Sequence, residues 1–248
     1  MNDESSNNTA ISTQEIELAE LLDSSYPLAK WFKSKCPGTF KHSQSVASMA
    51  EAVSAELGLD IQFMKVCAVY HDIGKCVNPN MFSENQLDNE NPHDSLDSWI
   101  STQIITRHVA DSVNILLGDH KFPRSVIEVI SQHHGNDIAI YFYSRAGKDA
   151  DPDSFRYPCS KPKSIEAAVL LICDRVEATS RSLVQSGNFD PAAVLEQTIN
   201  GLLDNGQFDD VNTKLGNLKK IRAALAKELE GVYQKRVDYA SAIEEIKD

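Results

Sequence analysis

The stretch Phe63-Met64-Lys65-Val66-Cys67-Ala68-Val69-Tyr70-His71-Asp72 joins an apolar helix to two side chains that bind metals. Its apolar residues recur at helical spacing, and Asp60 stands where the N-cap of that helix would lie. Adjacent residues of a helix point about 100° apart, so the imidazole and the carboxylate cannot both face one distant partner. They can instead flank a pair of metal ions beside the helix end.

Further imidazoles and a second carboxylate lie on either side of this pair. The full series of candidate ligands is His42, His71, Asp72, His108, His133, His134 and Asp174. A catalytic zinc takes about three protein ligands and leaves one position open, so the series exceeds what one metal needs. It predicts two metals that share a bridging carboxylate, an arrangement used for hydrolysis at phosphorus.

Each candidate ligand also has a structural interpretation. A single histidine could be a core residue bonded to the backbone, and His133-His134 could be a surface pair. Asp174 follows the apolar run 167–173, where an uncompensated carboxylate is costly. Arg175 could supply an ion pair, but helical side chains meet at a separation of three or four residues, not one. We therefore favour a metal ligand at Asp174.

The helical spacing of apolar residues continues along the chain, and no strand-like alternation is found. It predicts an all-α fold, a single helical bundle around a binuclear metal site. Residues 1–13 are predicted to be a disordered leader and residues 14–240 the domain. Helices are predicted at 27–35, 39–57, 60–70, 98–117, 123–134, 164–183, 190–203 and 213–239, after a short one opened by a Ser12-x-x-Glu15 capping box. Residues 135–163 are predicted to be a long irregular segment.

Composition limits the partners. The 248 residues carry a formal net charge of −12, so a basic footprint for a nucleic acid polymer is not expected. A small phosphate ester is not excluded, because two divalent cations would reverse the local field. The five cysteines form no C-x-x-C pair and no signal peptide is found, which predicts reduced thiols and a cytoplasmic location. No apolar run approaches the roughly 20 residues that cross a bilayer, so membrane insertion is not predicted.

The extended motif His71-Asp72-Ile73-Gly74-Lys75, within the series H…HD…H…HH…D, resembles the HD-domain metal-dependent phosphohydrolases. These are all-helical enzymes named for the His-Asp pair. Further segments are similar to the HD domain of membrane-anchored, seven-transmembrane cyclic di-AMP phosphodiesterases, and they are Phe82–Gln86, Asn91–Asp94, His133–Gly135, Tyr141–Tyr143, Phe155–Pro158, Lys161–Ala168 and Asp174–Ala178. The likeness covers about residues 39–183 and weakens through the C-terminal helices at 190–239.

Two features of this sequence depart from related enzymes. The membrane-anchored relatives carry seven transmembrane helices and an extracellular part ahead of the domain, and neither is found in these residues. The cyclic di-GMP branch carries Gly-Tyr-Pro shortly after the histidine pair, where this sequence has Gly135-Asn136-Asp137. The second departure favours cyclic di-AMP over cyclic di-GMP.

The resemblance implies roles for individual residues. It makes His42, His71, Asp72, His108, His133, His134 and Asp174 the ligands of two divalent transition metals. Asp72 would bridge both metals and take part in catalysis. Imidazole-rich ligation without thiolates suits Fe or Mn, and Zn stays open. Lys75 is expected near the scissile phosphate as a second catalytic residue, the alternative being a solvated loop lysine.

Four further residues are candidates for substrate binding together with Lys75. Arg145 would add positive charge near the departing phosphate. Tyr141 and Tyr143 could stack a nucleobase, the alternative, at least as well supported, being core packing against the final helices. His93 either lines the pocket or caps the following helix.

The expected reaction is hydrolysis of a cyclic dinucleotide, with cyclic di-AMP favoured, to the linear dinucleotide by a hydroxide that bridges the metals. One alternative is an HD-type phosphohydrolase acting on a mononucleotide or on cyclic di-GMP. Another is a catalytically silent nucleotide-binding sensor, which would normally show a lost ligand. The expected partner is a small nucleotide, and a homodimer is left open.

Overall fold

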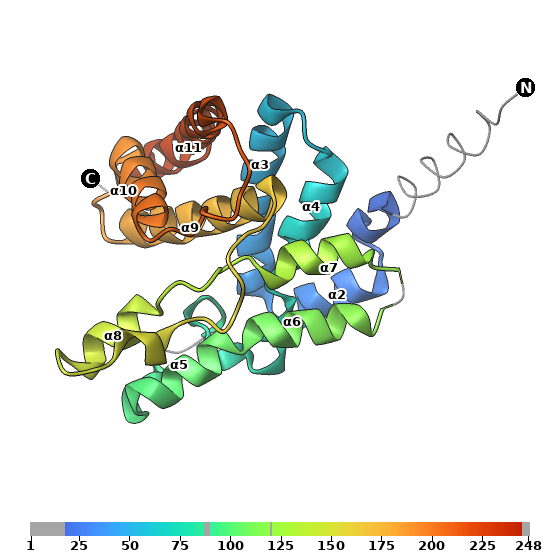
Figure 1. The fold of residues 1–248 in the computed structure, drawn as a ribbon. Coiled ribbons are helices and arrows are strands. Elements are labelled where there is room, and N and C mark those ends of the chain that lie inside the picture. The colour runs from blue at the N-terminus through green and yellow to red at the C-terminus, as the bar shows by residue number, and fades with distance from the viewer. Residues whose placement is uncertain (1–17, 87–89, 120, 245–248) are drawn as a thin grey trace, which may run out of the picture.

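Figure 1 shows the computed structural model, which describes residues 18–86, 90–119 and 121–244. The predicted all-α class is confirmed, because every regular element in these ranges is a helix and β-type pairing is limited to one isolated bridge, Ile138 to Arg156. The predicted leader at 1–13 and the capping box at Ser12 and Glu15 lie outside the described residues.

Helix α3 (Pro37–Leu57) lies at the centre of the bundle and packs against α4 (Ile61–Tyr70), α9 (Ile165–Gln185) and α11 (Leu215–Glu244). It begins at a proline and ends at Gly58, whose φ of 72° is the left-handed conformation that favours glycine at a helix C-terminus. One apolar face, which includes Val46, Met49 and Val53, is fully buried. The long central helix places His42 in the interior.

Two capping side chains fix the helices on either side of α3. Asp60 accepts a hydrogen bond from the Phe63 amide (3.0 Å) and starts α4, as predicted. Ser164 accepts one from the Ala167 amide (3.2 Å) and starts α9. The apolar run 167–173 at the start of α9 is buried. The hydrophobic core therefore continues directly into the residues that surround Asp174.

The outer helices also follow the predicted pattern. Helix α2 (Pro27–Lys35) packs on α3, while α10 (Pro191–Asp204) packs on both α9 and α11. Helices α9, α10 and α11 gather on one side of the molecule, as Figure 1 shows.

The prediction of one continuous helix at 98–117 was wrong, because the structure has two helices there. The structure has α5 (Ser98–Thr106) and α6 (His108–Leu117), which are separated at Arg107. In a continuous helix the Ile105 carbonyl would accept the amide of Val109, but here it accepts a hydrogen bond from the His108 ring (2.6 Å). A side chain that inserts into the helical ladder is a known cause of such a break. Likewise α7 spans Arg124–Ser131 and ends before the His133-His134 pair.

Residues 135–163 contain more regular structure than predicted. Helix α8 (Ile140–Ala146) carries Tyr141-Phe142-Tyr143 and packs against α5, and the 3₁₀ turn η5 (Pro152–Phe155) follows it. The prediction of an irregular segment was wrong there, because Phe142 is buried and anchors a short helix. The described residues after α4 include the 3₁₀ turns η1 (Ile73–Val77), η2 (Pro79–Met81), η3 (Ser83–Asn85) and η4 (Pro92–Ser95).

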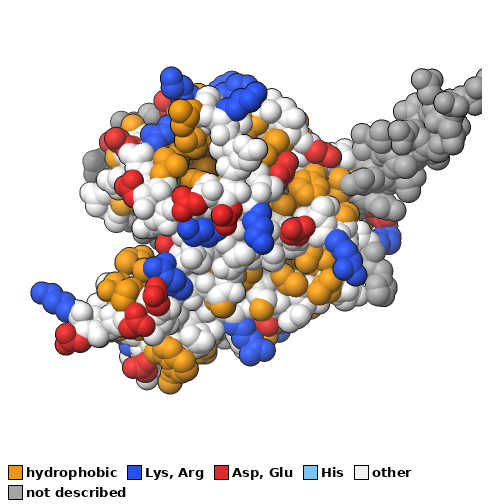
Figure 2. All heavy atoms as spheres, viewed as in Figure 1, with side chains coloured by type: hydrophobic (Ala, Val, Ile, Leu, Met, Phe, Trp, Pro, Cys, Tyr) orange, Lys and Arg blue, Asp and Glu red, His pale blue; other side chains and the backbone are white. Residues whose placement is uncertain are grey.

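The surface drawn in Figure 2 carries acidic and basic side chains interspersed with apolar ones. On this face, the described residues form no continuous basic patch of the kind that a nucleic acid polymer needs. None of the described helices is both long enough and apolar enough to span a bilayer.

Candidate metal centre

Three of the predicted ligand imidazoles are oriented by the last turn of a helix. In each case the ring lies just beyond a helix end, where main-chain carbonyls lack helical partners. The Nδ1 atoms donate three residues back, from His71 to Ala68 (2.8 Å), from His108 to Ile105 (2.6 Å) and from His133 to Ile130 (2.7 Å).

This arrangement decides which nitrogen of each ring is available. A carbonyl can only accept, so Nδ1 carries the proton and Nε2 of a neutral ring presents a lone pair. The Nε2 atoms of His108 and His133 face each other at 3.2 Å, where two lone pairs would repel without a shared cation. The buried Nε2 of His71 has no hydrogen-bond partner among the described residues. The donor set therefore fits metal ions.

Asp72 connects the rings through its two carboxylate oxygens. Its Oδ1 lies 3.1 Å from Nε2 of His108 and 3.6 Å from Nε2 of His133. Its Oδ2 lies 3.3 Å from Nε2 of His71 and 3.6 Å from Nε2 of His42. The side chain is 1% exposed, and although burial opposes its charge, His71 and other neighbours hold the pKa of Asp72 well below its usual range. Each oxygen thus faces a different set of imidazoles, as a bridging ligand requires.

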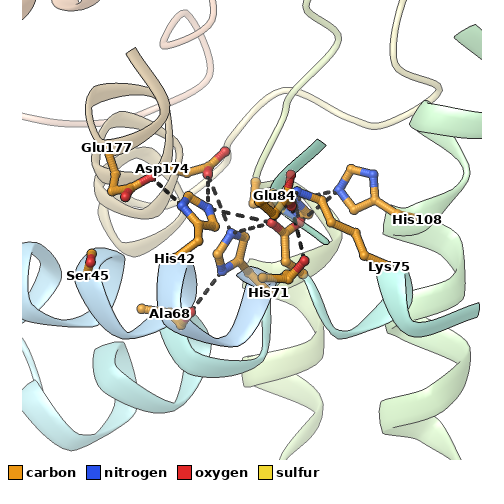
Figure 3. Close-up of polar contacts among 12 residues, drawn as sticks. His42, Ser45, Ala68, His71, Lys75, Glu84, His108, Asp174 and Glu177 are labelled. Atoms are coloured by element: carbon orange, nitrogen blue, oxygen red, sulfur yellow. Dashed lines mark hydrogen bonds and ion pairs between the residues drawn. The ribbon is translucent and has the colours of Figure 1, made fainter. Parts of the chain in front are cut away.

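Helix α9 supplies two carboxylates on either side of the His42 ring, as Figure 3 shows. Asp174 Oδ1 lies 2.9 Å from Nε2 of His42 and 3.5 Å from Nε2 of His71. Glu177 accepts a hydrogen bond from Nδ1 of His42. Arg175 pairs with Asp137 (2.7 Å), so an ion pair of Asp174 with Arg175 is not observed.

The seven predicted ligands converge in two groups of potential ligand atoms, with all atoms of a group within 4.8 Å of one another. We name the first the Asp174 group, which consists of His42, His71, Asp72 and Asp174. The second is the His134 group, which consists of Asp72, His108, His133 and His134. Burial lowers the pKa of both His133 and His134, which keeps their rings in the neutral form that binds a cation. The two groups share Asp72 alone.

Lys75 lies beside the shared carboxylate. Its Nζ atom is 2.7 Å from Asp72 Oδ2 and 3.0 Å from Glu84 Oε1, and it lies over the Phe82 ring. Burial disfavours the ammonium, but Asp72 and Glu84 raise the pKa of Lys75 above its usual range. Burial would likewise raise the pKa of Glu84, yet Lys75 lowers it to about 2. Both groups are therefore charged at neutral pH.

The glycine of the His-Asp-Ile-Gly-Lys motif permits a close approach of backbones. A Cβ atom added to Gly74 would lie 2.0 Å from the His108 carbonyl oxygen and 2.4 Å from the Ser112 amide. The Ser112 hydroxyl joins the same segments, since it accepts from the Gly74 amide and donates to the His71 carbonyl, both at 2.8 Å. These contacts hold the motif against α6.

The segment Phe82–Gln86 fixes the start of α3. The Asn85 side chain accepts from the amides of Gly38 and Thr39 (both 3.1 Å) and donates to the Thr39 hydroxyl (2.7 Å). Glu84 accepts from the same hydroxyl (3.0 Å) while it holds Lys75. This segment therefore positions both the helix that carries His42 and the predicted catalytic lysine.

A cleft of about 260 Å³ opens onto the candidate metal ligands. Aromatic side chains line one part of it, and Tyr157 stacks on the His134 ring with centroids 4.2 Å apart. Positive charge comes from Lys75, Arg175 and Arg181. Tyr141 also lines the cleft and is 58% exposed. A polar phosphate ester with flat, apolar rings would complement such a lining.

Two of the five residues predicted to bind substrate, Lys75 and Tyr141, line this cleft. The other three support its wall instead, because their polar or aromatic groups have partners elsewhere. Arg145 donates to the carbonyls of His93 (2.7 Å) and Leu96 (2.8 Å). Nε2 of His93 bonds the Met81 carbonyl (3.0 Å), and Tyr143 packs on Phe155.

The sequence prediction assigned no role to Glu177, Glu84, Asn85, Tyr157 or Arg181. One signal was available, because Asp174 and Glu177 are three residues apart on a helix and therefore share a face. The contacts of Glu84 and Asn85 with residues 38, 39 and 75 depend on tertiary packing.

Residues 39–179 match the HD domain family, and the chain therefore belongs to this family. The likeness that the motifs predicted is confirmed by individual relatives. Over 235 residues the chain is 34% identical to the cyclic-di-AMP phosphodiesterase PgpH of Bacillus subtilis (strain 168), covering 94% of this chain and 33% of that protein. It is 37% identical over 226 residues to PgpH of Listeria monocytogenes serotype 1/2a (strain 10403S), covering 90% of this chain and 31% of that protein.

The fold is similar to the crystal structure of the L. monocytogenes PgpH HD domain in complex with cyclic-di-AMP. The TM-score is 0.77 at 35% identity, and the match covers 84% of this chain and 97% of that chain. The chain spans about a third of the length of the curated relatives it matches.

Proposed function

We propose that this chain is a metal-dependent phosphodiesterase that hydrolyses cyclic di-AMP to the linear dinucleotide. The observation that carries the proposal is the position of Asp72, whose two oxygens face two separate groups of imidazole ligands. Two metals a few ångströms apart, joined by a carboxylate, suit hydrolysis of a phosphodiester. The complete ligand series counts against a silent sensor.

The choice of cyclic di-AMP is supported by relatives. Two proteins that are 34% and 37% identical to this chain over the aligned residues are named cyclic-di-AMP phosphodiesterases, and the HD domain of one is solved with that nucleotide. The segments that carry the likeness include Phe82–Gln86, which orients Lys75 through Glu84. Cyclic di-GMP and mononucleotides remain the alternatives to be tested.

In this reaction different residues would bind the metals, offset the phosphate charge and stack the bases. The Asp174 and His134 groups would hold two divalent cations, which polarise the phosphate and lower the pKa of a bound water. Iron or manganese suits these ligands, and zinc stays open. Lys75 and Arg181 line the cleft, where Lys75 would offset charge on the phosphate and Arg181 would extend the positive field. Tyr157 and Phe82 offer faces against which a purine can stack.

The test compares kcat/KM of Mn-loaded chain for cyclic di-AMP, cyclic di-GMP and a mononucleotide, with products separated by chromatography. The expected result is fastest cleavage of cyclic di-AMP, with the linear dinucleotide as first product. Some cleavage of cyclic di-GMP is also expected, because a few hydrogen bonds worth about 1–3 kcal/mol each separate the two bases. The His71→Ala chain, purified identically, measures contaminating activity. Faster cleavage of cyclic di-GMP or of the mononucleotide would refute the substrate assignment.

Two further properties belong to the proposal. A cytoplasmic location is supported by the five cysteines, all of which are free thiols. The domain is proposed to span residues 14–240, because α10 and α11 pack on α9 and α3 beyond the matched range. A homodimer stays a prediction, to be checked by light scattering.

A further inference from the structure

The imidazole of His42 is held differently from its neighbours. Its Nδ1 donates to the carboxylate of Glu177, whereas Nδ1 of His71, His108 and His133 each donate to a neutral main-chain carbonyl. A carboxylate behind a ligand imidazole fixes the tautomer and makes the opposite nitrogen a stronger donor to a metal. Among the described residues, only the Asp174 group contains an imidazole whose Nδ1 donates to a carboxylate.

Glu177 is built into the site from the same helix as a ligand. It follows Asp174 by three residues on α9, so both side chains reach the same ring from opposite sides (Figure 3). The Glu177 side chain is 4% exposed, and Nε of Arg181 lies 3.5 Å from its Oε2. Arg181 thus places a positive charge beside this buried carboxylate.

The two groups consequently differ in charge. The Asp174 group contains two carboxylates, and Glu177 stands directly behind it as a third. The His134 group contains three imidazoles and only the shared Asp72. A divalent cation is attracted more strongly to the position with more negative charge in a buried site.

We propose that Glu177 is a positioning residue that strengthens metal retention in the Asp174 group alone, so that the two metal positions differ in affinity. The inference rests on the proposed function only in requiring two metal positions, and its test uses neither substrate nor turnover.

The first experiment titrates metal-free full chain with Mn²⁺ and counts free Mn²⁺ by electron paramagnetic resonance. Glu177→Gln keeps the size of the side chain and an acceptor oxygen but removes the charge. We expect one equivalent to bind as in the unaltered chain and the other about 10-fold or more weakly, the usual cost of altering such a partner. Glu177→Ala should lose more, since the ring loses its hydrogen bond as well.

Glu166→Gln provides the matched control. It makes the same substitution on the same helix, beside Lys163 and Ser164 in a separate cleft. Mn²⁺ binding should be unchanged. Circular dichroism and thermal melts of the metal-free chains show whether each variant is folded.

The second experiment assigns the weakened position. His133→Ala disables the His134 group, and His71→Ala disables the Asp174 group. Adding Glu177→Gln should weaken Mn²⁺ binding in the His133→Ala chain and leave it unchanged in the His71→Ala chain.

Unaltered binding of both equivalents in folded Glu177→Gln, or equal weakening of both, would overturn the inference. The inference would also be overturned if Glu177→Gln weakened Mn²⁺ binding in the His71→Ala chain, where only the His134 group is intact, and not in the His133→Ala chain. If the His133→Ala or the His71→Ala chain binds no Mn²⁺, the titration of the Glu177→Gln chain still shows whether one equivalent is weakened and the other is not. Unequal positions in a chain that fails to cleave cyclic di-AMP would refute the proposed function and leave this inference standing.

Discussion

Replacing Lys75 by methionine should reduce both turnover and stability, for two separable reasons. Lys75 forms ion pairs with Asp72 (2.7 Å) and Glu84 (3.0 Å) in a buried setting. It lowers the pKa of Glu84 from about 4.5 to about 2, which corresponds to about 3 kcal/mol of stabilisation of the charged carboxylate. Breaking one side of a buried pair typically costs about 3–5 kcal/mol, which agrees.

The catalytic effect has its own magnitude. Removing one positive or donor group that stabilises developing charge typically lowers kcat by about 10²–10³. Metal content should stay near two equivalents, because Lys75 is not in either group of ligands. A contribution realised in the transition state lowers kcat and kcat/KM together.

The double variant Lys75→Met, Glu84→Gln separates the two effects. A neutral side chain at position 84 no longer needs a cation. Denaturant unfolding of the metal-free chain should therefore show recovery of the stability lost with the Glu84 ion pair, while the loss of the Asp72 ion pair remains. Turnover of cyclic di-AMP should stay low, with metal content measured by plasma mass spectrometry. Recovery of kcat together with stability would refute the direct role of Lys75, since it would then act only by holding Glu84.

Three further predictions concern the metals and the segment between α10 and α11. Asp72→Ala should lower metal occupancy in both groups, because one oxygen faces each, and two retained equivalents in metal analysis would remove its bridging role. Chelation should lower Tm by roughly 5–10 °C per metal, since a metal present at 100 times its Kd adds about 2.7 kcal/mol; an unchanged scanning calorimetry trace would contradict this. Gln207→Ala should destabilise the chain by about 1–3 kcal/mol in urea unfolding, because fully buried Gln207 donates to the Asn136 side chain and accepts from its amide. An exposed control such as Asn188→Ala should change stability by less than about 0.5 kcal/mol.

The ligand series could be predicted from sequence because its geometry is largely local. His71 and His133 each follow a helix end, and the ring bonds a carbonyl three residues earlier. An apolar helix that runs into a His-Asp pair therefore already contains the ring, its orienting partner and the direction of Nε2. Burial of the run 167–173 likewise predicted that the Asp174 carboxylate needs a compensating partner, and its Oδ1 lies 2.9 Å from Nε2 of His42.

Residues that act through distant partners could not be predicted in this way. Arg145 has the charge expected of a phosphate ligand, but only the packing of α8 on α5 shows that its guanidinium binds the carbonyls of His93 and Leu96. The helix break at Arg107 was missed for a related reason. Helical periodicity continues through it, and the competing hydrogen bond of His108 leaves no mark on the pattern of apolar residues.

The same contrast explains why His42 depends on the rest of the fold. Its ring lies within a continuous helix, where the main-chain carbonyls are already bonded, so the local device that orients His71 and His133 is not open to it. The ring must instead be held from another element, and Glu177 provides the hydrogen bond from α9. Any loosening of α9 against α3 would then reach the Asp174 group first and leave the rings of the His134 group that are held by helix ends in place. Local unfolding should therefore release the metal of the Asp174 group before the metal of the His134 group, although the Asp174 group binds more tightly in the folded chain.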